Sequence, residues 1–159
     1  MSQNCHVGLL IESDEKNILF LCTGNSCRSV LAEAYLNAAA TNWRGFSAGS
    51  TPTGAVHEQA VATLAAHDID ASYVRSKSWD EFAAPQAPTM DVIITVCDNA
   101  AGEACPIWPG HPTTYHWPFP DPAKFIGSDT EKQQHFEAVF AMIKTRLDEF
   151  LASHDTPEE

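Results

Sequence analysis

Two short runs without a charged side chain, the apolar residues 18–21 and the β-branched residues 92–96, constrain the fold of this chain most. The second run consists only of β-branched side chains, which suit a strand that is buried on both faces. Strands of this kind belong mainly to parallel sheets, because helices then cover both faces of the sheet. The two runs therefore favour an α/β fold.

Helical and strand patterns alternate along the rest of the chain. Apolar side chains recur at helical spacing over residues 28–40, 56–67 and 130–153, and weaker strand patterns occur over 44–47 and 113–117. Alternation of this kind, with right-handed crossovers, predicts a parallel sheet with helices on both faces. Ligands of such sheets bind beyond the carboxyl ends of the strands.

The length of 159 residues fits one domain with a real core. We expect residues 1–16 to form an N-terminal extension, residues 17–153 a single catalytic domain and residues 154–159 a C-terminal tail.

Charge and hydropathy restrict the partners and the compartment. Nine Lys and Arg against 21 Asp and Glu give a net charge of −12, which disfavours nucleic acid and anionic membrane surfaces as partners. No apolar run is long enough to span a membrane, and the first residues lack a signal-peptide pattern. We therefore expect a cytoplasmic protein, in which cysteines serve as reactive thiols or metal ligands more often than as disulfides. The chain has five of them: Cys5, Cys22, Cys27, Cys97 and Cys105.

A thiol and a guanidinium flank the turn that follows the first apolar run. Cys22 ends that run, and Arg28 opens the expected helix six residues later. The amides of such a loop and the N-terminus of the helix direct hydrogen-bond donors to one point, where arginine adds paired hydrogen bonds. We therefore predict an oxyanion site, in which the donors come from the following residues: Thr23, Gly24, Asn25, Ser26, Cys27 and Arg28.

The same surroundings favour the thiolate form of Cys22. A cysteine at a helix N-terminus beside an arginine typically has its pKa lowered from ~8.5 to roughly 3.5–7.5, so Cys22 is predicted to be a nucleophile at neutral pH. The hydroxyl of Ser29 could stabilise this thiolate, Gly24 lets the backbone turn tightly, and Asn25 could brace the loop. The alternative is a strand-end cysteine that is merely buried.

The nine-residue sequence LCTGNSCRS, followed by Glu33 and by SAG at residues 47–49, resembles the signature of the low-molecular-weight tyrosine phosphatase superfamily. It is most similar to the arsenate reductase branch of the thioredoxin-coupled type. The resemblance covers residues 17–152. It implies a single-domain, four-stranded parallel sheet flanked by helices, with Cys22 as the nucleophile and Arg28 as the clamp on the oxyanion.

Two further cysteines separate a reductase from a phosphatase. Phosphoester hydrolysis moves no electrons, whereas reduction of arsenate to arsenite takes two, which two thiols supply by forming a disulfide. Cys97 follows the run 92–96, and Cys105 lies eight residues later in a small-residue loop. Neighbouring strands lie ~4.8 Å apart, which is compatible with a disulfide to Cys22. The alternatives are a low-molecular-weight phosphatase acting on aryl phosphates and a non-catalytic oxyanion or redox-signalling module.

The segment 97–119 is similar to the redox segment of thioredoxin-coupled arsenate reductases, which implies a relay of thiols. In this relay, Cys22 attacks arsenate, Cys97 attacks the sulfur of Cys22 and releases arsenite, and Cys105 then forms a disulfide with Cys97. The electron donor is thioredoxin or glutaredoxin with glutathione. Both donors stay open, because the spacing of Cys97 and Cys105 differs from that of the best-known thioredoxin-coupled members.

Asp121, in the sequence Phe-Pro-Asp-Pro-Ala, matches the general-acid loop of the family. The resemblance implies that its carboxyl group protonates the departing oxygen, and the alternative is an ordinary Asp-Pro turn residue. Phosphatases usually continue this loop with tyrosines, whereas Ala123 and Lys124 follow here, which favours the reductase.

No cofactor and no metal site are expected. Structural zinc prefers close ligand pairs, and the sequence contains no Cys-x2-Cys. Some members of the family bind potassium through side chains like Asn25 and Glu33 together with an acidic residue after the second helix. The corresponding segment 73–77 ends in Lys77, whose ammonium group is expected to supply the charge itself.

Overall fold

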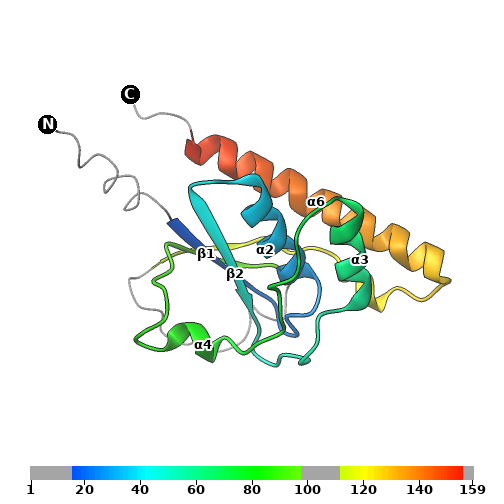
Figure 1. The fold of residues 1–159 in the computed structure, drawn as a ribbon, viewed down its shortest axis with the longest axis horizontal. Coiled ribbons are helices and arrows are strands. Elements are labelled where there is room, and N and C mark those ends of the chain that lie inside the picture. The colour runs from blue at the N-terminus through cyan, green and yellow to red at the C-terminus, as the bar shows by residue number, and fades with distance from the viewer. Residues whose placement is uncertain (1–15, 98–111, 156–159) are drawn as a thin grey trace, which may run out of the picture.

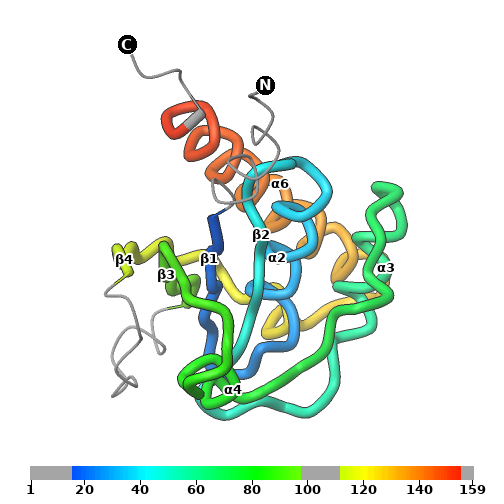
Figure 2. Tube along the Cα trace, turned by 60° about the vertical axis from the view of Figure 1, so that its left-hand side comes forward, coloured from blue at the N-terminus to red at the C-terminus, as the bar shows by residue number. Residues whose placement is uncertain are grey.

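The protein forms a parallel sheet of four strands in the order β2-β1-β3-β4. A computed structural model describes residues 16–97 and 112–155. The strands are β1 (Lys16–Leu21), β2 (Trp43–Ala48), β3 (Val92–Thr95) and β4 (Thr113–His116). They follow one another from β4 on the left to β2 on the right in Figure 2. The predicted α/β class, the parallel sheet and its four strands are confirmed.

Alternating side chains of β1 give the sheet two different faces. Ile18 and Phe20 are buried in a large core on one face, and Leu19 and Leu21 are buried in a smaller core on the other. Full burial of a side chain of this size contributes about 1.5–3 kcal/mol. The central strand is therefore held from both sides, as its uninterrupted apolar sequence predicts.

Three helices cover the face with the larger core (Figure 1). They are α2 (Arg28–Ala39), α3 (Glu58–Ala66) and α6 (Asp129–Asp155). The other face is packed by Phe82 of the short helix α4 (Asp80–Ala83) and by Met90. Helices thus lie on both faces, as predicted, but in unequal number. None of the helices in the described parts of the chain is both long and apolar enough to cross a membrane.

Helix boundaries differ from the predicted ones where a side chain caps the helix. α3 begins at Glu58 because the ring of His57 accepts a hydrogen bond from the amide of Gln59 at 3.1 Å. α6 begins at Asp129 because Ser128 and Glu131 exchange hydrogen bonds of 2.9 and 3.1 Å between side chain and backbone. This reciprocal pair is a capping box, which fixes the first turn.

Candidate active site

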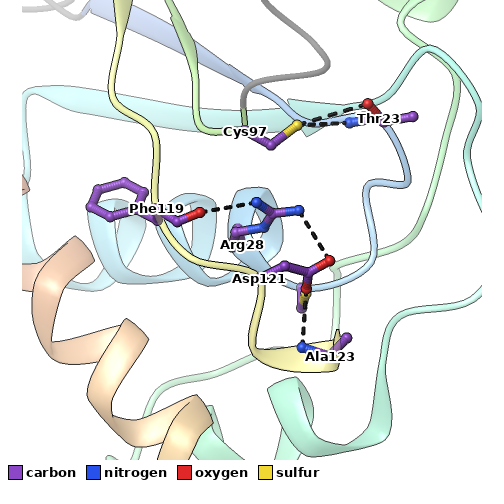
Figure 3. Close-up of polar contacts among 7 residues, drawn as sticks. Thr23, Arg28, Cys97, Phe119, Asp121 and Ala123 are labelled. Atoms are coloured by element: carbon purple, nitrogen blue, oxygen red, sulfur yellow. Dashed lines mark hydrogen bonds and ion pairs between the residues drawn. The ribbon is translucent and has the colours of Figure 1, made fainter. Parts of the chain in front are cut away.

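The carboxyl ends of β1 and β3 place two thiols side by side. The two strands pair up to Leu21 and Thr95, so that Cys22 and Cys97 follow at the same edge of the sheet. Both side chains are buried, and a hydrogen bond connects them. The amide of Thr23 also donates to the sulfur of Cys97 at 3.3 Å (Figure 3). The predicted proximity of Cys22 and Cys97 is therefore present in the fold.

The loop from Cys22 to Arg28 turns its carbonyl groups outward. The carbonyl oxygens of Thr23, Gly24 and Ser26 accept hydrogen bonds of 2.9, 3.0 and 2.8 Å from the amides of residues 51, 53 and 57. In a trans peptide the carbonyl of one residue and the amide of the next point in opposite directions. The amides of residues 24, 25 and 27 therefore point into the loop, as an oxyanion site requires.

One predicted oxyanion donor has a different partner. The amide of Thr23 is directed at the sulfur of Cys97, and its hydroxyl lies 3.8 Å from the same sulfur. Such contacts favour a negative charge on a sulfur. In this arrangement the amide of Thr23 donates to the thiol of Cys97. The inward amides of Gly24, Asn25 and Cys27 are the candidate donors to an oxyanion.

Asn25 braces the loop from its rear. Its amide nitrogen donates to the hydroxyl groups of Ser29 at 2.9 Å and Ser47 at 3.0 Å, and its side-chain oxygen accepts from the amide of Lys77 at 2.8 Å. The side chain is fully buried, and its backbone has a positive φ of 47°, a conformation that asparagine tolerates better than most residues. Ser29 thus supports Asn25, in addition to any contact with the Cys22 sulfur.

Arg28 lies between the loop and the segment that carries Asp121 (Figure 3). Its Nη1 donates to the carbonyl oxygen of Phe119 at 3.0 Å, and its Nη2 lies 3.4 Å from Oδ2 of Asp121. The Nε atom of Arg28 is buried and has no hydrogen-bond partner among the described residues. A buried donor without a partner is costly, so this Nε–H group is a candidate donor to an anion bound in the loop.

Asp121 is held by three contacts at the mouth of the loop. Its Oδ1 accepts hydrogen bonds from the amide of Ala123 at 3.0 Å and from the thiol of Cys27 at 3.8 Å, and its Oδ2 faces Arg28. Burial and the nearby carboxylate of Asp121 raise the pKa of Cys27. Cys27 therefore acts as a thiol donor to Asp121, besides contributing its amide to the loop.

The predicted thiolate form of Cys22 is wrong for this arrangement. The hydrogen bond with Cys97 and the burial of the side chain raise the pKa of Cys22, and the charge of Arg28 lowers it only in part. In this arrangement the pKa of Cys22 is therefore raised, not lowered as predicted. The prediction failed because it considered Arg28 and the helix alone, whereas the adjacent sulfur of Cys97 has the larger effect.

The structure shows why a glycine is needed at position 49, which the sequence alone does not. Any Cβ at this position would overlap the carbonyl oxygens of Cys22 and Thr23. Its amide and carbonyl bond to Lys77 and Trp79 at 2.9 Å. The SAG sequence was the only signal for it, since Gly49 contacts the loop backbone rather than a ligand.

The last predicted thiol, Cys105, lies outside the described residues, as does Cys5. Among the described residues, the structure brings together Cys22, Cys97, Arg28 and Asp121 around the loop.

Similarity to known proteins covers most of the chain. Residues 17–157 match the family described as low molecular weight phosphotyrosine protein phosphatase. The arsenate reductase of Bacillus subtilis (strain 168) is 38% identical over 138 residues, which span 86% of this chain and 96% of that protein.

Solved structures agree with this match. The arsenate reductase from Archaeoglobus fulgidus DSM 4304 has a TM-score of 0.67 at 27% identity, with 85% of this chain and 98% of that chain covered. The thioredoxin-dependent arsenate reductase of Corynebacterium glutamicum has a TM-score of 0.61 at 22% identity, with 93% of this chain and 70% of that chain covered, and this likeness bears on the fold alone.

Proposed function

This chain belongs to the low-molecular-weight phosphotyrosine protein phosphatase family, and we propose that it is an arsenate reductase. One observation carries the proposal: the buried thiol of Cys22, the first residue of the oxyanion loop, shares a hydrogen bond with the buried thiol of Cys97. A phosphatase has no need of a second thiol at this place, whereas a two-electron reduction requires one.

Arsenate binding is assigned to the loop and to Arg28. The inward amides of Gly24, Asn25 and Cys27 would bind the arsenate oxygens together with the buried Nε–H of Arg28, which has no partner among the described residues. These donors supply the local positive field that a chain of net charge −12 otherwise lacks.

The reduction is proposed to occur in two steps. First, the sulfur of Cys22 bonds to arsenic, and one arsenate oxygen leaves as water after protonation, for which Asp121 is the candidate acid. Second, the sulfur of Cys97 attacks the sulfur of Cys22. The electron pair of the S–As bond then stays on arsenic, which leaves as arsenite, and the two sulfurs become a disulfide.

The contacts of the two thiols suit this order. Cys22 must give up its proton when arsenate enters, and a dianionic arsenate oxygen can accept it. Thr23 donates to the sulfur of Cys97 and so favours its thiolate, which is the attacking form in disulfide exchange.

Reductive recycling is proposed to run through Cys105. Its thiol would attack Cys97, release Cys22 and leave a disulfide between Cys97 and Cys105. A dithiol protein such as thioredoxin opens a disulfide of this kind, and glutaredoxin with glutathione is the competing donor. The cytoplasm keeps such donors reduced, and it is our proposed location for the enzyme.

A single-turnover experiment tests this function. The fully reduced protein is incubated with arsenate without oxygen or external thiol, arsenite is measured, and the lost thiols are mapped by mass spectrometry after alkylation. We expect one arsenite for each two thiols lost, with the loss at Cys97 and Cys105. A Cys5→Ser variant is the matched control and should behave identically, since Cys5 lies in the N-terminal extension.

The same samples discriminate the phosphatase. Hydrolysis of an aryl phosphate without any arsenite or thiol loss would reject the reductase and support the phosphatase. Arsenite formation with thiols lost at Cys22 and Cys97 would keep the reductase but reject the role of Cys105.

A further inference from the structure

Two oppositely charged side chains are buried behind the oxyanion loop. Glu33 on α2 has 5% of its surface exposed, and Lys77 has 8%. Charged groups are rarely buried to this extent unless they are paired or have a specific role. Neither side chain takes part in the reaction proposed above, so their burial calls for another explanation.

A chain of short hydrogen bonds connects this pair to the loop. The hydroxyl of Ser47 donates to Oε1 of Glu33 at 2.6 Å and accepts from Asn25 at 3.0 Å. The amide of Lys77 donates to the side-chain oxygen of Asn25 at 2.8 Å. Asn25 has a positive φ within the loop, and its side chain is held at one end by Ser47, the partner of Glu33, and at the other end by the backbone of Lys77.

The charges of the two side chains depend on each other. Burial raises the pKa of Glu33, while the positive charge of Lys77 and the hydrogen bond from Ser47 lower it. Burial likewise lowers the pKa of Lys77, and the charge of Glu33 raises it. Without Lys77, Glu33 would shift toward its protonated form, which can donate to Ser47 instead of accepting from it. The donor and acceptor roles along the hydrogen bonds from Glu33 through Ser47 to Asn25 would then change.

The oxygen atoms around this pair do not fit a potassium ion. The side-chain oxygen of Asn25 accepts from Lys77, and the hydroxyl of Ser47 is engaged with both Glu33 and Asn25. The ammonium group of Lys77, which donates to the carbonyl oxygen of Arg75 at 2.9 Å, already supplies a positive charge to the carboxylate. A cation beside it would meet a like charge.

We propose that Lys77 is a positioning residue of the oxyanion loop: its backbone amide holds the side chain of Asn25, its buried ammonium group supplies a positive charge near Glu33, the acceptor of Ser47, and this charge makes the site independent of alkali cations. As a role in arsenate reduction this rests on the function proposed above. Binding of inorganic phosphate, a tetrahedral oxyanion that needs no reduction, tests the loop separately.

The first test uses the wild-type protein. Arsenate turnover and phosphate affinity, measured by titration calorimetry, are compared in potassium chloride and choline chloride at equal ionic strength. We expect no difference between the two salts. Stimulation by potassium would overturn the proposal, and this test holds even if a Lys77 variant does not fold.

The second test uses Lys77→Ala with methylammonium as the probe. The variant should lose roughly tenfold to hundredfold in kcat/KM, the scale of a small misplacement of reacting groups, and should bind phosphate more weakly. Methylammonium should restore both properties by placing a cation beside Glu33. Lys144→Ala, which removes an exposed lysine of α6, is the matched control and should respond to neither change.

The outcomes separate the two proposals. If the folded Lys77→Ala variant matches the wild type, or if methylammonium restores neither property, Lys77 has no positioning role. If the wild type binds phosphate but never forms arsenite, the proposed function fails, while the phosphate titrations still decide the role of Lys77.

Discussion

The front and the rear of the oxyanion loop are built differently. We define the front as Cys22, Arg28, Cys97 and Asp121, and the rear as Asn25, Ser29, Glu33, Ser47 and Lys77. The hydrogen bonds that join the rear residues, including one from the backbone amide of Lys77, measure 2.6–3.0 Å. The front has sulfur contacts, an ion pair of 3.4 Å and a buried arginine nitrogen without a partner among the described residues.

The difference shows that one set of residues fixes the shape of the loop and another set is available for binding and reaction. The rear has donors matched to acceptors, so it keeps the loop in one shape before any ligand arrives. The front keeps donors that an oxyanion would satisfy and thiols that exchange partners during the reaction. Preorganised donors of this kind stabilise developing charge without rearrangement of the protein. Changes at the front should therefore affect activity, and changes at the rear should affect stability as well.

The largest expected effect is at the nucleophile. Cys22→Ser should lower arsenite formation by at least about a thousandfold, because a serine hydroxyl is a far weaker nucleophile without an adjacent base. The thermal unfolding midpoint should hardly change, since the rear is untouched. Single-turnover arsenite assays and calorimetry measure the two quantities. Substantial arsenite formation by the variant would show that another thiol performs the attack.

The next effect is at the oxyanion clamp. Arg28→Lys keeps the charge but loses the planar fork and the Nε–H group, so kcat/KM for arsenate should fall by about a hundredfold. Phosphate titration should show weaker binding, with little loss of stability. Unchanged phosphate affinity would contradict the assignment of the partnerless Nε–H to the anion.

A change at the rear should lower stability as well as activity, unlike the two changes at the front. Asn25→Ala leaves the partners of a buried amide unsatisfied and should cost about 1–3 kcal/mol in unfolding free energy, together with reduced activity. Asn25→Gly relieves the strain of the positive φ and is the matched control, so it isolates the lost hydrogen bonds. Chemical denaturation measures both variants. A loss of activity in Asn25→Ala at full stability would mean that front and rear are not separate.

The smallest effect concerns the proton of Cys22. Cys97→Ala removes the contact that most raises the pKa of Cys22, so that pKa should fall and the thiolate fraction at pH 7 should rise. Alkylation of Cys22 by iodoacetamide should accelerate by about three- to tenfold, because the thiolate is the reactive form. In the wild type the rate should keep increasing above pH 9. A slower reaction in Cys97→Ala would reverse the sign of this coupling.

Much of the fold and the front of the site were predictable from the sequence. The core of β1 is apolar and β3 consists of β-branched residues, and Arg28 follows Cys22 at the spacing of a strand-loop-helix unit. The rear was harder, because Ser47 and Lys77 are distant in sequence from Asn25 and join it only through the fold. α4 was missed because its four residues are too few for a helical period.

The electrostatics of Cys22 could not be read from its neighbours in the chain. A pKa depends on every group nearby in space, and the sulfur of Cys97 is 75 positions away. The predicted topology placed the two thiols together correctly. The direction of the pKa shift of Cys22 could be inferred only from the contacts in the structure.

The outward carbonyls of the loop have a consequence for protein engineering. Backbone amides of residues 51, 53 and 57 hold the carbonyls of Thr23, Gly24 and Ser26. The segment after β2 thus fixes the backbone conformation of the loop through these hydrogen bonds. Grafting residues 22–28 alone into another α/β protein should give a segment without oxyanion affinity, whereas a graft that also carries residues 49–57 would transfer the shape along with the sequence.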